Sequence, residues 1–420
     1  QNTSATLSKN IVKCCKRKIS TCEGVGDGLF SSAVLEQIVK RGKAVFRLIK
    51  NIKVFRAGAW RDSQILLAGP SIALLDDKLA LTIPSLAETD GQGMYAVPGY
   101  VDRHVHITGG GGEGGFSNAV APLRVEALVR AGVTTVVGLL GTDGTVRSVE
   151  SLCAKAMALE EEGLSARFLT GSYDYPSPTA TGSVKRDILL LPGCIGVKIA
   201  ISDHRSSCLQ DWELARLAAD TWQAGVLKGR PAFVHLHVGR GKTGLAPVFH
   251  VLEKSDLPIA AFHPTHLWNQ QEDAVRFAAM GGWADFTTTA DPEESAGQML
   301  WALNHCPKEH VTFSTDANGS MPVWNEKKEM VGISACRCAN LHETVRALVT
   351  LGMLPLEEAI RPCTCNAAAA LTLPRKGALC EGADADILLL DESLNIQSVF
   401  ARGREMLRMG ELMFTPKFSC

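Results

Sequence analysis

The chain has 420 residues, a length that suits one large domain together with a smaller module. Hydrophobic residues make up 46% and charged residues 21%, the balance of a globular protein that can bury a sizeable core. A formal net charge of -1 offers no bulk attraction to nucleic acid or to an acidic membrane. No window approaches the roughly eighteen uninterrupted apolar residues of a transmembrane helix. We therefore expect neither nucleic acid nor a membrane as a partner.

Residues 1–44 are rich in Ser, Thr and Lys and hold few acids, and the chain begins with Gln1 rather than Met. We interpret them as an N-terminal extension without a fixed function. A basic, acid-poor leader is also typical of a transit peptide, so organelle targeting stays open beside a cytoplasmic location. The 13 cysteines are scattered along the chain, which argues for reduced thiols rather than a disulfide framework.

The flanks, residues 45–97 and 378–414, consist of short apolar runs separated by turn residues, a pattern typical of strands. Gly382, Asp384 and Gly403 mark turns in the second flank. We predict that the two flanks together build one small β-sandwich module.

Between the flanks, residues 98–377 alternate between strand-like runs and stretches with apolar residues at helical spacing. The predicted strands are Tyr100–His106, Thr134–Leu140, Ala166–Tyr173, Ile195–Ala200, Ala232–Val238, Ile259–His266, Ala284–Thr289 and Val311–Asp316. This alternation predicts an α/β fold, a TIM-like (β/α)₈ barrel. A doubly wound open sheet is the rival, but the glycine-rich turn Gly109 to Gly112 follows a His-x-His rather than opening a phosphate-binding turn.

Residues that can bind metal fall near the ends of five predicted strands. They are His104, His106, Lys198, His237, His266 and Asp316. In such a barrel the active site lies at the carboxyl ends of the strands. His104 and His106 are two residues apart on a strand, so both imidazoles can reach one ion. A single histidine in a strand is more often a packed residue, and it is the joint placement that predicts a metal site.

Lys198 stands in an almost wholly apolar strand, which disfavours a surface lysine. A desolvated neutral lysine can take up carbon dioxide as a carbamate, and that anion can bridge two cations. We therefore predict two divalent ions with the Lys198 carbamate and a hydroxide between them. The predicted ligands are His104, His106 and Asp316 for one ion, and His237 and His266 for the other. Zinc suits these ligands, although other metals are tolerated.

Several motifs extend this pattern over residues 46 to 414. They are Pro98-Gly-Tyr-Val-Asp-Arg-His-Val-His106, Gly109-Gly-Gly-Gly-Glu113, Gly138-Leu-Leu-Gly-Thr-Asp143, Leu169-Thr-Gly-Ser-Tyr173, Gly196-Val-Lys198, Ile201-Ser-Asp-His-Arg205, Pro264-Thr-His266, Ser314-Thr-Asp316-Ala-Asn-Gly-Ser320 and Ala383-Asp-Ala-Asp386. With them the chain resembles the amidohydrolase superfamily and, within it, the isoaspartyl dipeptidases. The metal-binding residues mark only the superfamily. The glycine-rich run with Glu113, together with Tyr173, Arg205 and Ser320, carries the resemblance to the dipeptidases.

The resemblance implies hydrolysis of the isopeptide bond of β-aspartyl dipeptides by a metal-bridging hydroxide. It implies that Asp316 takes the hydroxide's proton and delivers it to the leaving amine. It implies that Tyr173 donates a hydrogen bond to the developing oxyanion. The family resemblance also suggests a large homo-oligomer.

The substrate-binding residues also follow from the resemblance. Glu113 matches the carboxylate that holds the substrate's α-ammonium, and Thr142 matches a substrate-contacting position. Arg205 and Ser320 match residues that hold a substrate carboxylate. Plainer roles stay open: a solvated loop tip for Glu113, a packed ring for Tyr173, a turn serine for Ser320, and for Arg205 an ion pair with Asp203.

The sequence departs from the family pattern at two positions. Asn269 stands where the dipeptidases carry an arginine that helps to bind a substrate carboxylate. Either Arg240 or Lys242 compensates, or the preferred substrate differs. Arg103 stands where the family tends to carry glutamine, and strand alternation predicts that it points away from the metals.

Three functions are compatible with this pattern of residues. The first is a metal-dependent dipeptidase acting on β-aspartyl dipeptides. The second is another amidohydrolase, acting on N-acyl amino acids or cyclic amides, substrates that lack a free α-ammonium for Glu113 to hold. The third is a non-catalytic barrel that serves as a scaffold, which the complete set of metal-binding residues disfavours.

Overall fold

The computed structural model describes residues 46–79, 81, 83, 86–324 and 330–417. The predicted extension 1–44 lies outside these residues. Among the described residues, no helix combines the length and the apolar character that crossing a bilayer requires.

Strands from both flanks join into one sheet. The strands are β1 (Phe46–Arg56), β2 (Ala59–Ala68), β3 (Ser71–Asp76), β4 (Ala87–Pro98), β15 (Ile387–Leu390), β16 (Ile396–Ala401), β17 (Arg404–Arg408) and β18 (Glu411–Leu412). Their order is β18-β17-β16-β15-β4-β1-β2-β3, and β15 pairs antiparallel with β4. The layered packing of a sandwich stays a prediction, because the pairing joins all eight strands into a single sheet.

Alternating residues of this sheet form a core of its own. Ile49, Ile52, Ile65, Leu67 and Phe400 are buried together there. Side chains two residues apart in a strand point to the same face, so this spacing places the apolar residues of several strands in one layer. A strand of a flank can therefore bury one face without help from the barrel.

The central segment forms the predicted barrel strands. They are β5 (Tyr100–Val105), β6 (Val133–Gly138), β7 (Ser165–Gly171), β8 (Cys194–Ile201), β9 (Phe233–Val238), β10 (Phe262–Thr265), β11 (Ala284–Thr287) and β12 (Val311–Ser314). Strands β5 to β10 form one parallel sheet in sequence order, and β11 pairs in parallel with β12. This is the TIM-like α/β barrel that the alternation predicts.

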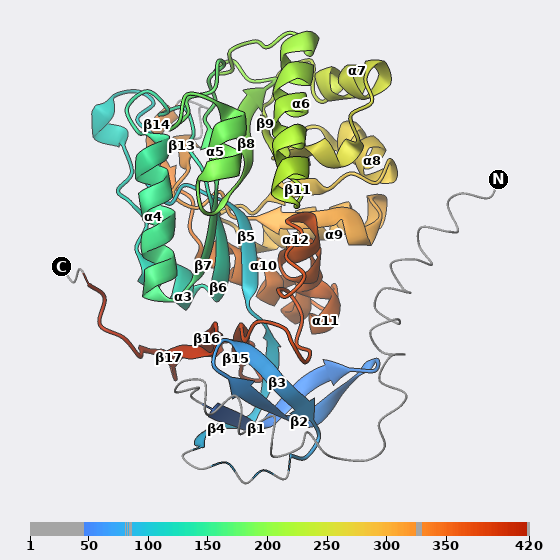
Figure 1. Ribbon diagram of the computed structural model, residues 1–420. Helices are drawn as coiled ribbons and strands as arrows, with labels where there is room; N and C mark the ends of the chain where they lie inside the picture. Colours follow the sequence, from blue (N-terminus) through green and yellow to red (C-terminus); the bar gives the residue numbers. More distant parts are fainter. Residues whose placement is uncertain (1–45, 80, 82, 84–85, 325–329, 418–420) are drawn as a thin grey trace. The chain divides into compact units, whose positions relative to one another are not determined.

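Helices cover the outside of these strands (Figure 1). They are α3 (Val125–Arg130), α4 (Val149–Glu162), α5 (Val184–Leu190), α6 (Asp211–Lys228), α7 (Ala246–Lys254), α8 (Gln271–Ala279), α9 (Pro292–His305), α10 (Ala339–Thr350), α11 (Leu356–Ala359) and α12 (Cys365–Ala370). Short 3₁₀ turns lie at Phe116–Asn118, Ile259–Ala261, Leu267–Asn269, Lys308–His310 and Arg361–Cys363. An antiparallel hairpin, β13 (Ser320–Trp324) and β14 (Met330–Ala335), follows the last barrel strand.

Side chains close the barrel where the two parallel sheets meet. Asp285 on β11 is fully buried and accepts hydrogen bonds of 2.6 Å from Thr265 on β10 and from Thr312 and Ser314 on β12. Between β12 and β5, the Nη1 atom of Arg103 donates to Thr312 at 2.9 Å. The barrel's last strands are thus tied by a buried polar network in addition to backbone pairing.

Three predicted strands end earlier than their metal-binding residues, since β5 stops at Val105, β10 at Thr265 and β12 at Ser314. The segment predicted as Ile259–His266 begins with a 3₁₀ turn and is extended only over Phe262–Thr265. His266 and Asp316 both lie just past a strand end, in left-handed backbone with φ of 65° and 52°. Non-glycine residues rarely adopt this conformation, and when they do the position is often functional.

Candidate metal centre and substrate pocket

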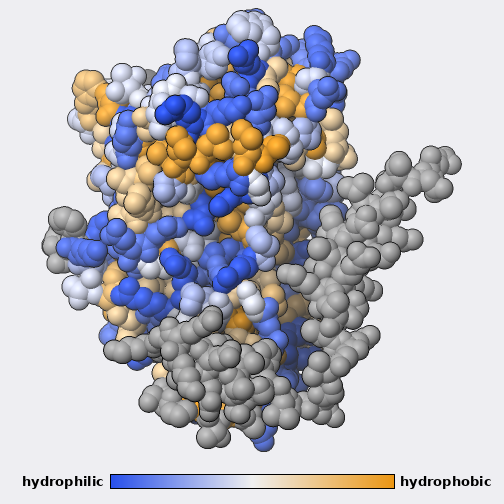
Figure 2. Space-filling view, in the orientation of Figure 1, coloured by the Kyte–Doolittle hydropathy of each residue, from blue (hydrophilic) through white to orange (hydrophobic). Residues whose placement is uncertain are grey.

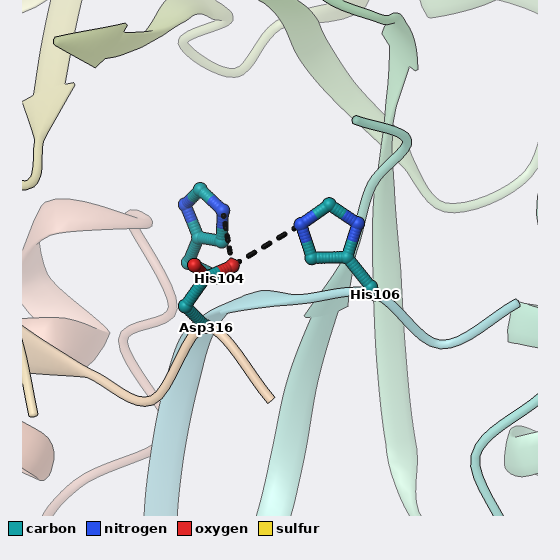
Figure 3. Close-up of side chains that lie close together, drawn as sticks. All are labelled: His104, His106 and Asp316. Atoms are coloured by element: carbon teal, nitrogen blue, oxygen red, sulfur yellow. Dashed lines mark ion pairs between the residues drawn. The ribbon is translucent and has the colours of Figure 1, made fainter. Parts of the chain in front are cut away.

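The first cluster joins the end of β5 to the segment after β12. His104 lies in β5, His106 directly follows it, and the backbone N–H of His106 donates to Ala317 O at 2.9 Å. This contact brings Asp316 beside both imidazoles. Its Oδ1 lies 3.3 Å from Nε2 of His104 and 3.1 Å from Nε2 of His106 (Figure 3). One ligand atom from each residue lies within 4.8 Å of the others, so the three can hold one metal ion.

The second cluster comes from the neighbouring strands β8, β9 and β10. The Nζ atom of Lys198 lies 3.3 Å from Nε2 of His104. The His266 ring lies 4.8 Å from the His104 ring and 4.6 Å from the His237 ring, measured between centroids. The structure therefore brings all the predicted metal-binding residues together at the carboxyl ends of the strands.

Several buried polar atoms at this place lack the partners that buried groups normally have. Among the described residues, Nε2 of His266 and Oδ1 of Asp316 have no hydrogen-bond partner. Buried polar groups in proteins are nearly always satisfied by a protein group, water or an ion. A carboxylate oxygen and imidazole nitrogens that converge on one place fit a divalent cation.

Burial and neighbouring charges keep His104, Lys198 and Asp316 in protonation states that can bind a cation. Burial, with Lys198 nearby, holds the pKa of His104 well below its usual value, so the ring is neutral. Burial lowers the pKa of Lys198 to about 7, so a neutral amine is accessible near neutral pH. Burial alone would raise the pKa of Asp316, but the imidazoles of His104 and His106 beside its Oδ1 outweigh burial and hold that pKa well below its usual value.

The predicted substrate-binding residues meet at Glu113. Its Oε1 accepts a hydrogen bond from Thr142 at 2.8 Å and lies 3.3 Å from Nη1 of Arg205. Its Oε2 accepts from Ser320 at 2.9 Å. Burial raises the pKa of Glu113, but these bonds together with a backbone bond outweigh it, so the carboxylate stays ionised. The structure brings these residues from separate loops into one polar cluster.

Tyr173 lies between this cluster and the metal-binding residues. Its Oη is 2.6 Å from Nδ1 of His237, and its ring centroid is 5.3 Å from the Arg205 guanidinium. Burial raises the pKa of Tyr173 well above its usual value, so the phenol keeps its proton. A phenol in this position is a fixed hydrogen-bond donor.

The remaining predicted residue lies apart from the cluster. Asn269 is exposed in the 3₁₀ turn after His266, and no hydrogen bond joins its side chain to another described residue. Arg240 and Lys242 are exposed as well. Arg103, by contrast, is fully buried, and its Nη2 lies 2.7 Å from Nδ1 of His263.

Sequence reasoning foresaw the ion pair of Asp203 with Arg205 but missed the contacts that hold the predicted metal-binding residues in place. His235 is two residues before His237 on β9, and its Nε2 lies 2.8 Å from Nδ1 of His104. Asp203 contacts both His237 and Arg205. The i, i+2 spacing of His235 and His237 was the available signal, because it places both side chains on the inner side of one strand.

Solved structures of a known enzyme are similar to this chain over most of its length. A crystal structure of the β-aspartyl dipeptidase from the thermophilic, keratin-degrading Fervidobacterium islandicum AW-1, in complex with the dipeptide β-Asp-Leu, is 37% identical in sequence. The match covers 89% of this chain and 100% of the other, with a TM-score of 0.83. A second structure of that enzyme is 36% identical, with a TM-score of 0.82 and the same coverage.

Curated relatives match over part of their length. An adenine deaminase from Geobacillus kaustophilus is 25% identical over 342 residues, which are 77% of this chain and 52% of the relative. A dihydroorotase from Staphylococcus epidermidis is 32% identical over 104 residues, 25% of this chain and 24% of the relative. The chain thus spans about half the length of the adenine deaminase it matches.

A family model adds an independent match. The model described as the amidohydrolase family covers residues 229–406, which include His237, His266 and Asp316. Together with the extended similarity to solved dipeptidases, this match establishes the family. The chain belongs to the amidohydrolase superfamily and, within it, to the β-aspartyl (isoaspartyl) dipeptidases.

Proposed function

We propose that this chain hydrolyses the isopeptide bond of β-aspartyl dipeptides, using two divalent metal ions. The observation that carries the proposal is the pairing of Glu113 with Arg205 beside the metal-binding cluster. One anion and one cation, 3.3 Å apart and each partly exposed, match a substrate that carries an ammonium and a carboxylate close together. The similarity to a β-aspartyl dipeptidase solved in complex with β-Asp-Leu supports the same substrate class.

In this proposal the polar cluster binds the two charged groups of the substrate. Glu113 takes the α-ammonium, and Thr142 keeps that carboxylate oriented through its 2.8 Å bond. Arg205 and Ser320 bind a carboxylate, for which a guanidinium is well suited. Asn269 is exposed and its amide is uncharged, so this position offers the substrate no cation for a second contact with a carboxylate.

We assign the predicted metal-binding residues to two ions according to the two clusters described above. His104, His106 and Asp316 would hold one ion, and His237 and His266 the other, with a carbamate on Lys198 between them. Zinc fits these ligands. When bound, such ions lower the pKa of water and polarise the scissile carbonyl.

The chain's own residues move the proton and stabilise the charge. Asp316 accepts a proton from the attacking water and delivers it to the leaving amine, since it sits where two imidazoles keep it ionised. Tyr173, held as a neutral phenol, donates a hydrogen bond to the oxygen on which negative charge develops.

A hydrolysis panel tests the proposal. The metal-loaded protein is offered β-Asp-Leu, α-Asp-Leu and N-acetyl-leucine. We expect turnover of β-Asp-Leu alone. Preferential turnover of N-acetyl-leucine would contradict the dipeptidase proposal.

Another amidohydrolase activity, on N-acyl amino acids or cyclic amides, is the second candidate. Asn269, which is exposed and stands where the resemblance implies an arginine in the dipeptidases, favours this candidate. Glu113→Gln separates the two candidates, because only a β-aspartyl substrate presents a free α-ammonium. We expect kcat/KM for β-Asp-Leu to fall by roughly 10- to 100-fold, the value of a charge-assisted hydrogen bond of about 1.5–3 kcal/mol. Unchanged turnover would leave the second candidate.

We further propose that the chain works as a homo-oligomer in a reducing compartment. Large apolar side chains are exposed on two helices, Leu190 on α5 and Trp212, Val226 and Leu227 on α6. Figure 2 shows hydrophobic residues gathered in a band over α5. Cys194, Cys336, Cys338 and Cys363 are buried free thiols, which suits reducing conditions. Light scattering on the purified chain tests the assembly, and a monomer mass at micromolar concentration would contradict it.

The proposed domains are a β-module of residues 45–97 and 378–414 and a hydrolase barrel of residues 98–377. The continuous sheet formed by β1–β4 and β15–β18 supports this division.

A further inference from the structure

The carboxylate of Asp203 lies between two functional groups of the site. It follows strand β8 and has a side chain that is 6% exposed. Its Oδ2 lies 2.9 Å from Nε2 of His237 and 2.9 Å from Nη2 of Arg205. Its Oδ1 accepts from the Nε and the backbone N–H of Arg205, at 3.0 and 2.9 Å. One side chain therefore contacts a metal-binding residue and a substrate-binding residue at once.

The contact with His237 selects one form of the imidazole. A neutral ring carries its proton on one nitrogen and a lone pair on the other. An ionised carboxylate only accepts hydrogen bonds, so Asp203 places the proton on Nε2 of His237. The lone pair is then on Nδ1, the nitrogen that faces Tyr173 Oη at 2.6 Å. Carboxylates that orient a metal-bound histidine in this way are a common feature of metal sites.

The contact with Arg205 fixes the direction of the guanidinium. Asp203 occupies the Nε and Nη2 edge in a bidentate pair, which is the strongest geometry for such groups. The Nη1 atom is left to point at Glu113, 3.3 Å away. Asp203 thus orients the Arg205 guanidinium so that Nη1 faces Glu113.

The surrounding loop holds Asp203 in this position. Ser206 donates from its backbone N–H and its hydroxyl to Asp203 O, at 3.0 and 2.7 Å. Gly239, after β9, passes so close that a Cβ there would lie 2.5 Å from the Asp203 Cβ. Ser202 adopts left-handed backbone with φ of 53°. A larger residue at 239 or a relaxed turn at 202 would move the carboxylate.

We propose that Asp203 is a positioning residue that couples the second metal position to substrate binding through His237 and Arg205. The inference rests on the proposed metal-dependent dipeptidase function. It assigns Asp203 no contact with substrate. Removing its charge weakens metal binding at His237 and carboxylate binding at Arg205 together, although the two side chains have different tasks.

The test compares Asp203→Asn with Arg205→Met and with the control Asp211→Asn. Asp211 is a half-exposed aspartate at the start of α6, paired with His250. Zinc affinity is measured on chelator-stripped protein by competition with a chromophoric chelator, separately for the first and second equivalents. The KM for β-Asp-Leu is measured at saturating zinc.

We expect Asp203→Asn to weaken the second zinc equivalent roughly 10- to 100-fold, leave the first within about 3-fold, and raise KM. Arg205→Met should raise KM and leave both zinc affinities near those of the wild type, because Asp203 still holds His237. Asp211→Asn should match the wild type in every measurement.

Three results would overturn the inference. One is wild-type zinc affinity in Asp203→Asn; another is equal loss of zinc in Arg205→Met, which would make the ion pair a purely structural support. A wild-type chain that binds no zinc would remove the basis of the proposed function as well, so the two failures can be told apart. If Asp203→Asn does not fold by circular dichroism, Asp203→Glu, which keeps the charge, replaces it with the same expected direction for second-site zinc.

Discussion

The two halves of the candidate metal centre differ in how their ligands are held. On the β5 and β12 side, His104, His106 and Asp316 contact one another directly. On the β8 to β10 side, His237 is held by Tyr173 and Asp203, and the Nδ1 of His266 lies 2.5 Å from the hydroxyl of Thr287. In the first half the ligands contact one another through Asp316 in addition to one neighbour, His235, which lies 2.8 Å from His104. In the second half His237 and His266 are held by neighbours that are not predicted to bind metal. Changes in the first half should therefore abolish chemistry, and changes around the second should weaken metal binding in a graded way.

The largest expected effect is at Asp316 in the first half, to which we assign two tasks, binding of metal and transfer of the proton. We expect Asp316→Asn to lower kcat for β-Asp-Leu by roughly 10²–10⁴-fold, because the amide cannot accept the proton. Steady-state kinetics at saturating zinc give the value, with Asp211→Asn as the control. A loss of less than 10-fold would mean that another group moves the proton.

The hydrogen-bond network of Asp285 joins the barrel strands β10, β11 and β12. Asp285→Ala removes the acceptor of three hydroxyl donors and leaves the buried Arg103 without its nearest carboxylate, 3.9 Å away. Breaking a buried pair in this way costs about 3–5 kcal/mol of unfolding free energy. Urea unfolding measures the loss. The exposed Asp62→Asn on β2 is the control, expected within about 0.5 kcal/mol of the wild type. A loss below about 1 kcal/mol at Asp285 would show that backbone pairing alone closes the barrel.

The smallest expected effect is on the pH dependence of stability, through the contact that joins Tyr100 of β5 to His342. Tyr100 Oη lies 2.9 Å from Nδ1 of His342, whose Nε2 donates to Leu394 O at 2.8 Å. Burial lowers the pKa of His342 to about 4, below the value of about 6.5 in an unfolded chain. The unfolded state therefore binds the proton first as the pH falls. The stability that the neutral ring contributes is present above pH 6.5 and is lost between about 6.5 and 4, by up to about 3 kcal/mol.

His342→Gln removes this titration and tests its size. The unfolding free energy of the variant should depend less on pH between about 4 and 6.5 than that of the wild type. Parallel pH profiles for the two proteins would mean that His342 is not responsible for the acid sensitivity.

Much of the barrel and the metal-binding set could be predicted from the sequence. The helical and strand periods are local signals, and they placed a strand at Tyr100–His106, which the structure has at Tyr100–Val105. The carboxyl ends of parallel strands meet at one end of a barrel, so His104, Lys198 and His237 could be placed together without coordinates. The chemistry of the residue types then pointed to metal.

The partners of these ligands could not be predicted, because they depend on which side chains face one another across strands. The sequence suggested Asp203 only as an ion-pair partner of Arg205, and only the structure shows that its Oδ2 also contacts His237. Arg103 gave no sign that it would be buried beside His263. The left-handed backbone at His266 also has no local signal, since this conformation is usually adopted by glycine or asparagine.

We propose above all that two metal ions at this site support hydrolysis of a β-aspartyl dipeptide. The most direct test titrates zinc, in the presence of bicarbonate, into chelator-stripped protein and follows the hydrolysis of β-Asp-Leu at each addition. We expect the activity to rise until two equivalents of zinc per chain are bound and then to stay constant. Full activity in the stripped protein, or no hydrolysis of β-Asp-Leu after two equivalents have bound, would contradict it.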